Sequence, residues 1–498
     1  MKVMSPVYYM VKNRRVTESF VDATGAKITP PTGFTQGNQV LITNDDFTYT
    51  SDKALPATYT ADGKTYQLKG WYKGKDKPPT LSTGTPTYKV TYDDNDDLTV
   101  VYDEAKVTLP GYTYQFGFVD EAGQLINPEL VNLTYDMWFF EDKIETILEK
   151  SVKATNSGDL KEMTIADKVV KEPTAETLGE NTIYSPINIQ FTLPKYYETI
   201  VASEGSDTNY PLPQMIQNSS GRESAVVATK DTFALKKLTD QTFGMKTLYT
   251  NSLVPNTPYP IPFRRYTKWA GGTVPVNTTY MEVMSPVFYM LKNRRITESF
   301  VDATGAKITP PTGFTQGKQI VIDSDNFTYT SAKALPTSYT ADGKTYLFQG
   351  WYKGKTKPNT LTTSTTPTYD TTFDDNDDMT AVYKEASISA NLTMRGAVDV
   401  IDNGATMEYW EVLLKNTGEA PLTSIKIKPT TEWVAGISAP TNLFILGTGQ
   451  NAKSPKITKE QWEAGFEIPL DKSLPVGGQL TINLIGTKVT GQPNQVLK

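Results

Sequence analysis

An acidic turn that occurs twice in the chain carries the residue types of a calcium-binding loop. Asp93, Asn95 and Asp97 stand at positions 1, 3 and 5 of that loop pattern, and Glu104 stands at position 12. Residues 374–385 repeat the arrangement. The pattern requires Gly at position 6 for its sharp turn, and both copies have an apolar residue there. We therefore expect a solvated turn whose charges protect a sheet edge, with no metal ligands. Calcium binding is the alternative.

The composition removes several other kinds of chemistry. The 498 residues include no Cys and no His, which excludes disulfides, thiol nucleophiles and Cys-based zinc sites and removes the commonest general base. The net charge of −6 and the pI near 5.2 differ from the clustered basic surface of a nucleic-acid-binding protein. No run of about 18 apolar residues is present, so no transmembrane helix is predicted. We expect no enzyme, no cofactor, no nucleic-acid partner and no membrane span.

Aromatic residues offer the remaining candidate chemistry, which is contact of exposed rings with a sugar or a protein. Trp71 and Trp351 end alternating segments beside Gly, so we expect both to anchor a core. Residues 137–140 form the apolar run Met-Trp-Phe-Phe, and only part of this run fits the buried face of a predicted helix. Trp138 and Phe139 are therefore the candidate ligand-contacting residues. Burial of both in a core is the alternative.

The elements that hold these residues belong to an internal repeat. Residues 1–104 match residues 281–385 with few changes, which is the signature of a repeated module. Alternation of apolar and polar residues predicts four or five strands in roughly 90 residues of each copy. They include a strand over residues 16–22, a strand over residues 66–71 that ends at Trp71, and a final hairpin over residues 88–102. Each copy is thus expected to be a small mixed β-sheet domain.

A fainter third copy lies between the two. Residues 118–128 keep the frame of residues 20–30, and residues 266–272 resemble the segment around Trp71. Residues 283–289 take the place of the closing strand. The middle unit is therefore predicted to be the same module with a long insertion.

The predicted insertion spans about residues 129–262 and has a different character. Apolar residues between 140 and 152 fall at helical spacing, with acidic residues early and basic residues late, which predicts a helix. A capping-box pattern predicts a second short helix over residues 159–170. Residues 182–200 are strand-like. An α+β insertion follows from these patterns.

The first residues of the chain copy the end of the middle unit, because residues 3–10 match residues 283–290. We expect residues 1–11 to be the closing strand of a preceding module whose body is absent. The chain is accordingly expected to be a fragment of a longer array.

The repeat can be compared with known families through three motifs in fixed order. They are Phe-Val-Asp-x-x-Gly-x-x-Ile-x-Pro, Gly-Lys-x-Tyr-x-(Leu/Phe)-x-Gly-Trp-Tyr and a Thr/Val-rich closing strand. This order resembles the mucin-binding-type and internalin B-type repeats of Gram-positive surface proteins. The resemblance implies a β-grasp-like fold, tandem arrays, and a role in adhesion or in holding a binding domain away from the cell wall.

A separate domain is predicted at the C-terminal end. Residues 407–418 read as a strand followed by a turn, residues 422–428 as its return strand, and residues 466–470 and 479–485 as a late pair. The Tyr…Asn-Thr-Gly-x-x-Pro-Leu-Thr-x-Ile arrangement is similar to the Ig-like β-sandwich repeats of bacterial surface proteins.

Together these patterns predict a mainly β, multidomain protein with β-grasp-like repeat modules, a middle module with an α+β insertion, and a C-terminal Ig-like β-sandwich. The predicted divisions are 1–11 (closing strand), 12–105 (first repeat copy), 106–290 (middle module), 291–386 (second repeat copy) and 387–498 (C-terminal domain).

The predicted function is that of a non-enzymatic adhesin or stalk on a Gram-positive surface, extracellular or in the cell wall. The insertion would contact a host or cell-wall glycan, a glycoprotein or another surface protein, because loops on a rigid scaffold commonly carry binding. Two alternatives stay open. One is a purely structural spacer with recognition elsewhere, and the other is a glycan-acting enzyme in the insertion.

Overall fold

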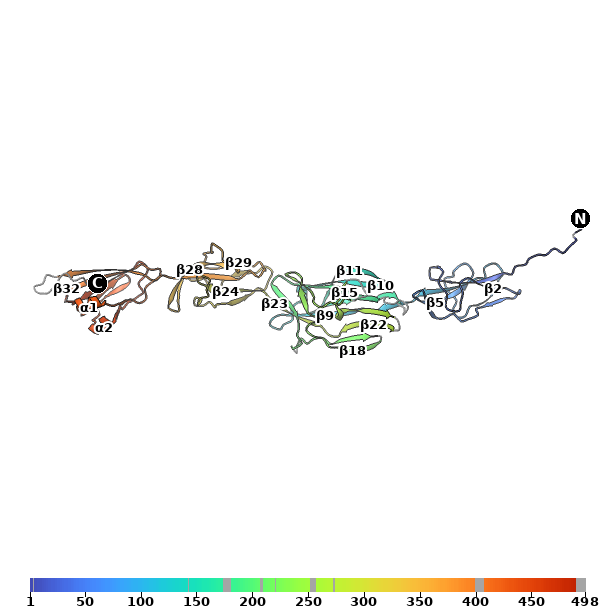
Figure 1. Cartoon of the computed structure of the whole chain (residues 1–498), viewed down its shortest axis with the longest axis horizontal. Helices are drawn as coiled ribbons and strands as arrows, with labels where there is room; N and C mark the ends of the chain where they lie inside the picture. Colours follow the sequence, from blue (N-terminus) through green and yellow to red (C-terminus); the bar gives the residue numbers. More distant parts are fainter. Residues whose placement is uncertain are drawn as a thin grey trace. The chain divides into compact units, whose positions relative to one another are not determined.

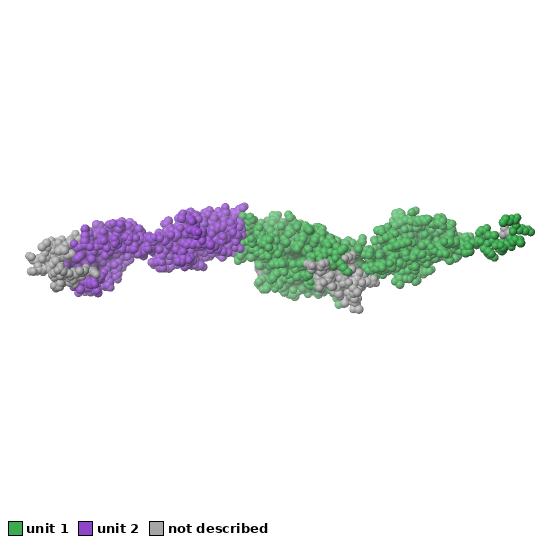
Figure 2. Space-filling model, turned by 45° about the horizontal axis from the view of Figure 1, so that its top comes forward, with its two compact units in different colours: residues 1–294, 323–325 green, residues 295–322, 326–498 purple. Residues whose placement is uncertain are grey.

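A computed structural model describes residues 1–2, 4–141, 143–172, 181–206, 209–219, 221–250, 257–271, 274–398 and 407–489. Clustering of contacts divides the chain into two compact units, residues 1–294 with 323–325 and residues 295–322 with 326–498 (Figure 2). Nearly every described element is a strand, and the two short α-helices both lie in the second unit. The mainly β, multidomain fold predicted from the sequence is confirmed.

The first repeat copy is built on a five-stranded mixed sheet. Its strands, in spatial order, are β2 (Asn38–Leu41), β1 (Arg15–Val21), β7 (Leu98–Glu104), β5 (Lys64–Lys73) and β4 (Thr58–Ala61). The first and last strands of the copy, β1 and β7, run parallel in the centre, and the other neighbours are antiparallel. A short pair, β3 (Thr48–Thr50) with β6 (Thr87–Lys89), contributes Tyr49 and Tyr88 to the core beneath Val16, Phe20 and Trp71.

The second repeat copy has the same pairing throughout. Its sheet, in spatial order, comprises β25 (Lys318–Val321), β24 (Arg295–Val301), β30 (Met379–Glu385), β28 (Lys344–Lys353) and β27 (Ser338–Ala341), and its short pair is β26 (Thr328–Thr330) with β29 (Thr368–Asp370). The small mixed sheet expected for each copy is therefore present in both.

The predicted hairpin over residues 88–102 is wrong. β6 pairs with β3, whereas β7 pairs with β1 and β5. The reason lies in the acidic turn between them. The Asp96 carboxylate accepts hydrogen bonds from the backbone N–H groups of Thr91 (2.7 Å) and Tyr92 (2.8 Å), and Tyr92 and Asp94 have positive φ. This turn leads the chain out of the short pair and into the large sheet.

The middle region (residues 106–293) contains a five-stranded sheet that shares four strand positions with the repeat copies and has its fifth strand at the opposite edge. Its strands, in spatial order, are β12 (Thr155–Ser157), β13 (Leu160–Ile165), β9 (Tyr112–Val119), β23 (Val287–Asn293) and β16 (Tyr197–Ala202). β9 and β23 are parallel, and Phe118 lies opposite Tyr289 as Phe20 lies opposite Val100 in the first copy. Of residues 283–289, predicted to take the place of the closing strand, residues 287–289 belong to β23, whereas Val283 ends β22 of another sheet.

A nine-stranded sheet covers the core of this smaller sheet (Figure 1). Its main path runs through β11 (Ile144–Lys153), β10 (Asn132–Glu141), β15 (Asn181–Thr192), β21 (Tyr266–Gly271), β22 (Val274–Val283), β17 (Met215–Ser219) and β18 (Arg222–Val226), with β20 (Thr242–Met245) on β15 and β19 (Leu235–Lys237) on β20. The remaining elements are the pair β8 (Lys106–Leu109) with β14 (Lys168–Lys171) and the 3-10 turns η1 (Pro128–Leu130) and η2 (Ile261–Phe263).

Both helices predicted for the insertion are wrong. The segment expected to be the first helix forms the antiparallel strands β10 and β11, and the segment expected to be the second forms β13 and β14. Gly158, with φ 58°, makes the turn from β12 into β13. The apolar spacing is compatible with a helix, but β10 lies between two strands, so pairing across the sheet overrides the local pattern.

The predicted counterpart of the Trp71 strand is also wrong. β5 pairs antiparallel with the closing strand β7, and the strand that pairs in this way with β23 is β16, not β21. Trp71 lies opposite Val100, and Ala202 lies opposite Tyr289, the residue that corresponds to Val100. β21 belongs to the nine-stranded sheet. Added chain therefore lies on both sides of β16 rather than in one block before residue 266.

The C-terminal region has two layers around one core. Its five-stranded sheet runs β31 (Ala390–Val398), β32 (Met407–Asn416), β37 (Gln479–Ile485), β34 (Asn442–Gly447) and β35 (Gln450–Lys453). The second layer comprises β33 (Lys426–Ile427), β36 (Phe466–Glu467), α1 (Thr431–Gly436) and α2 (Lys459–Ala464). The two predicted hairpins are wrong, because β32 pairs with β31 and β37 while β33 pairs with β36.

The last two observations concern the N-terminal residues and the described helices. Residues 4–13 are in no strand, and Val7, Tyr9 and Val11 are exposed. Within the described residues, none of the helices has the length and apolarity that crossing a membrane needs.

Candidate functional site

The two predicted contact residues, Trp138 and Phe139, are buried on opposite faces of β10. Trp138 is 0% exposed and Phe139 is 8% exposed. Phe139 joins the main core between the two sheets, and Lys168 Nζ lies 4.4 Å from its ring centre. Trp138 stacks on Tyr259 with 5.7 Å between ring centres. The structure thus gives the burial that the sequence left open as the alternative, and the role of these residues in ligand contact stays a prediction.

The exposed apolar side chains lie on the adjacent strand, β11. Ile147 pairs with Trp138, and Ile144 pairs with Glu141. Ile144 is 64% exposed, and Ile147 and Leu148 are each 37% exposed. β11 is the first strand of its sheet, so its outer backbone edge is also unpaired among the described strands. Side chains alternate along a strand, so Ile147 lies on the Trp138 face of the sheet and Ile144 on the opposite face. We name Ile144 and Leu148, with the strand edge beside them, the β11 surface.

A single carboxylate fixes the course of β11. Asp136 of β10 accepts hydrogen bonds from Ser151 N (2.7 Å) on one side and Asn188 Nδ2 (2.7 Å) on the other. Ser151 and Asn188 both have positive φ, at 52° and 50°. Register shifts occur in both pairings of β10, which identifies these residues as bulges. Asp136 therefore holds the bulges that bend both neighbouring strands.

A buried arginine joins the nine-stranded sheet to the module beneath it. Arg265 is 0% exposed and donates hydrogen bonds to Met281 O (2.6 Å) and Pro110 O (3.2 Å). Tyr114 Oη of β9 donates to the same Met281 carbonyl at 3.0 Å, and burial raises the pKa of Tyr114. These bonds satisfy backbone carbonyls where the two sheets meet.

The side-chain oxygens proposed for a calcium loop accept hydrogen bonds within the protein. Asp97 Oδ1 accepts from Thr17 N at 2.7 Å, Asn95 Oδ1 accepts from Lys75 N at 2.8 Å, and Asp93 Oδ1 accepts from Asn95 N at 3.1 Å. These oxygens bond to different segments of the protein rather than facing one point. In the described part of the chain, no cluster of three or more acidic side chains is arranged to hold a metal ion.

Another carboxylate of this turn, Asp96, is buried beside a lysine. Lys73 Nζ lies 2.9 Å from Asp96 Oδ1 and 5.6 Å from the centre of the Tyr88 ring. Burial acts to raise the pKa of Asp96, but the hydrogen bonds from Thr91 and Lys73 outweigh it and the pKa is lowered. The ion pair ties the end of β5 to the turn, and this role is structural.

Trp71 and Trp351 anchor cores, as the sequence predicts. Trp71 is 8% exposed, its Nε1 donates to Gly84 O at 3.0 Å, and it stacks on Tyr88. The Gly before it has φ 138°, and a Cβ there would lie 2.6 Å from Ser82 O. The Gly-Trp pair is therefore required by the bulge in β5 and by the close approach of residue 82.

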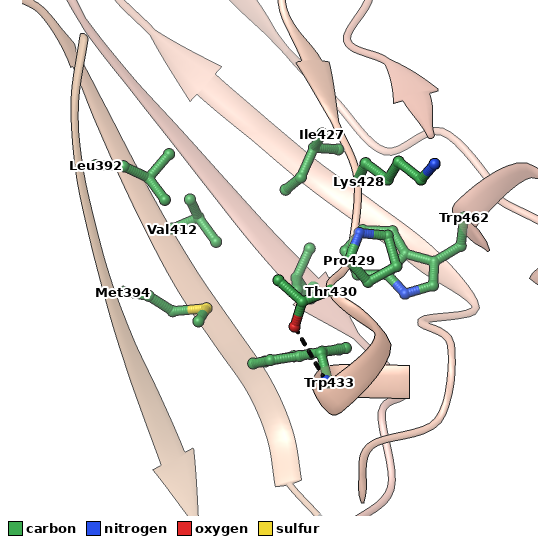
Figure 3. A pocket seen from close by; sticks show the side chains of 10 residues that line it. Leu392, Met394, Val412, Ile427, Lys428, Pro429, Thr430, Trp433 and Trp462 are labelled. Carbon is green, nitrogen blue, oxygen red and sulfur yellow. Dashed lines mark hydrogen bonds between the residues drawn. The ribbon is translucent and has the colours of Figure 1, made fainter. Parts of the chain in front are cut away.

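A second candidate site is an apolar groove in the C-terminal region (Figure 3). It has a volume of about 230 Å³ and lies between β31 and β32 on one side and the segment from β33 to α1 on the other. Thr430 Oγ1 accepts from Trp433 N at 3.1 Å, which caps α1 and sets Trp433 at the groove. Neither the groove nor the β11 surface was identified from the sequence, because both depend on which strands lie at sheet edges.

Comparison with known proteins gives little. No protein-family model matches the chain, and no characterised protein is significantly similar in sequence. Solved structures that align with it include a C-terminal fragment of the pilus adhesin SpaC from Lactobacillus rhamnosus GG, at 13% identity and a TM-score of 0.18, over 57% of this chain and 99% of that one. The open conformation of SpaC aligns at 10% identity and a TM-score of 0.16, over 73% of this chain and 49% of that one. At TM-scores this low, the likeness carries no argument about fold or function.

Proposed function

We propose that this chain is a non-enzymatic adhesin or stalk of a Gram-positive cell surface, in which the middle region contacts the ligand and the two repeat copies act as spacers. The protein would work outside the cell or in the wall. Its partner would be a host or cell-wall glycan, a glycoprotein or another surface protein.

The observation that carries the proposal is the difference between the middle region and the two copies. All three share four strand positions built around one parallel pair. The middle region alone adds a nine-stranded sheet, from chain inserted on both sides of β16. Two copies are near-identical and the third, middle region has gained extra strands. Such an addition is expected where a binding function has been built onto a supporting module.

The β11 surface is the proposed contact area within the added sheet. It combines exposed apolar side chains with an unpaired strand edge, and exposed apolar patches commonly mark interaction sites. Glu145, Glu149 and Lys150 lie on the same strand and would supply polar contacts at the rim. Trp138 and Phe139 lie on opposite faces of the paired strand β10 and would anchor the sheet beside this surface.

The test is binding of the whole chain to an array of host and wall glycans and glycoproteins. Deletion of residues 129–262 is unsuitable, because it would remove β16 and most of the nine-stranded sheet. The test variant is instead Ile144→Lys with Leu148→Lys, and the matched control is Leu41→Lys in the first copy, where the side chain is 47% exposed. Both are surface changes expected to alter stability by no more than about 0.5 kcal/mol.

The proposal predicts that the wild-type chain and the control variant bind the same array members and that the β11 variant loses them. Binding that is unchanged in the β11 variant would place recognition elsewhere in the chain. No binding to any member would favour a spacer. Release of cleaved sugar from an array glycan would identify a glycan-acting enzyme and overturn the proposal.

A further inference from the structure

The groove of the C-terminal region exists because one strand of its large sheet lacks a cover. Met394 of β31 pairs with Val412 of β32, so both side chains point to the same, inner face. Val412 is 2% exposed, but Met394 is 45% exposed and Leu392 is 58% exposed. The inner face of β31 is therefore apolar and open, whereas the same face of β32 is buried.

The second layer ends at the groove with an unpaired strand edge. β33 pairs with β36, and no other described strand pairs with β33. Ile427, Lys428 and Pro429, at the end of β33 and just beyond it, line the groove opposite Leu392 and Met394 (Figure 3). An unpaired strand edge beside an apolar floor combines the two features that an added β-strand requires.

The dimensions favour side chains over a larger molecule. An apolar cavity of roughly 150 Å³ holds one benzene-sized group, and the groove has about 230 Å³. Small-molecule sites usually span about 300–1,000 Å³. The groove thus has room for one or two apolar side chains, which is what one face of a short strand presents.

We propose that the groove binds an extended peptide segment with apolar residues at alternate positions. The backbone of the segment pairs with the open edge of β33, and its apolar side chains cover Leu392 and Met394. Trp433 and Trp462, 5% and 3% exposed, also line the groove and add apolar ring surface to it. This inference does not depend on the proposed function.

The experiment uses the full chain and a capped synthetic hexapeptide of alternating Thr and Val. Binding is followed by tryptophan fluorescence, because Trp433 and Trp462 line the groove, and by hydrogen exchange of residues 390–396 and 425–428. We expect saturable binding with slower exchange in both segments. The control peptide has Pro at its fourth position, which removes a backbone donor and breaks the strand. The Kd of the control peptide is expected to be at least about tenfold higher.

Matched variants locate the site. Leu392→Lys with Met394→Lys places charges on the exposed floor and is expected to weaken binding at least about tenfold. Leu446→Lys changes a side chain of the same domain that is 48% exposed and does not line the groove, so it is expected to leave binding unchanged. Circular dichroism confirms that each variant is folded.

Four results would overturn the proposal. They are no binding at millimolar peptide, equal binding of the Pro peptide, equal weakening by Leu446→Lys, and fluorescence changes without slower exchange at residues 425–428. Self-association of the chain that is abolished by the Leu392 and Met394 changes would also overturn it, since the occupant would then be a second copy.

Discussion

The first repeat copy and the middle region place different residues at the same position of the same sheet. Glu18 of β1 lies opposite Leu98 in the parallel pair, and its carboxylate is buried, accepting hydrogen bonds from Tyr49 and from Asn38 Nδ2 (2.9 Å). In the middle region the corresponding residue is Phe116, which lies opposite Val287. One sheet design thus supports a buried polar network in one unit and an apolar contact in the other.

The cover of the sheet explains the difference. In the first copy the cover includes the short β3–β6 pair, whose Tyr49 hydroxyl reaches Glu18. In the middle region the cover is the nine-stranded sheet, and Phe116 packs on Phe191 and Phe263 with ring centres 5.6 and 5.7 Å apart. A larger apolar cover replaces the polar network and gives the module a second surface.

The largest expected effect is from giving the middle region the residue of the first copy. Phe116→Glu would bury a carboxylate without the Tyr and Asn partners that Glu18 has, since Phe116 is 0% exposed. We expect a loss of about 3–5 kcal/mol in the free energy of unfolding of the middle region. Urea unfolding followed by hydrogen exchange, which resolves the regions, measures it. Wild-type stability of this variant would contradict the proposed difference between the covers.

The second-largest loss of stability is expected when Trp71 of the first copy is replaced by Ala, the residue found at the same sheet position in the middle region. Trp71→Ala copies Ala202, the residue opposite Tyr289. The first copy has no large sheet to fill the space, so we expect a loss of about 3 kcal/mol in its stability. Trp351→Ala in the second copy is the matched variant and is expected to lose the same amount. A loss below about 1 kcal/mol in both would mean that Trp71 and Trp351 do not anchor the cores.

A smaller effect is expected from the polar network itself. Tyr49→Phe removes one donor to the buried Glu18 carboxylate and leaves Asn38, which predicts a loss of about 1.5–3 kcal/mol. Tyr329→Phe removes the equivalent donor to Glu298, at 2.6 Å, in a copy that has Lys318 at the position of Asn38. Differential scanning calorimetry of both variants checks the prediction. A loss below about 0.5 kcal/mol in Tyr49→Phe would contradict the role of the buried network.

The smallest effect concerns acid stability. The pKa of Asp96 and of Asp377 is lowered below the ordinary value of 3.8, so each carboxylate stabilises its copy above that pH and the contribution is lost as pH falls below it. Asp96→Asn is expected to reduce the stability of the first copy at about pH 6 and to flatten its decline between about pH 4 and pH 2. Urea midpoints across this range test it, with the second copy of the same molecule as the internal reference. An unchanged slope would contradict the role of the ion pair with Lys73.

Much of the strand content could be predicted from the sequence, but the partners of each strand could not. Residues 66–71 and 182–192 alternate or carry β-branched residues, and both form strands. The hairpin prediction at residues 88–102 failed because β6 and β7 belong to different sheets. A sequence-based prediction pairs neighbouring strands as hairpins. In the first repeat copy and in the C-terminal region, the chain instead passes from one sheet to the other between these strands.

Prediction of the exposed residues from the sequence failed for the same reason. The helical spacing around residue 140 placed exposure on Trp138 and Phe139, whereas the sheet buries both and exposes Ile144 and Leu148 on the next strand. Likewise the Trp269 segment resembles the Trp71 segment in sequence, and yet β16, with Ala202 in place of Trp, holds the matching position. Short-range patterns cannot report which strand a distant segment covers.

The central claim is that the middle region differs from the repeat copies because it carries the contact surface. The most direct measurement is the affinity of the whole chain for one array member, compared between Ile144→Lys with Leu148→Lys and the control Leu41→Lys. The account predicts a Kd at least about tenfold higher for the β11 variant and an unchanged Kd for the control. Equal affinities in the two variants would contradict it.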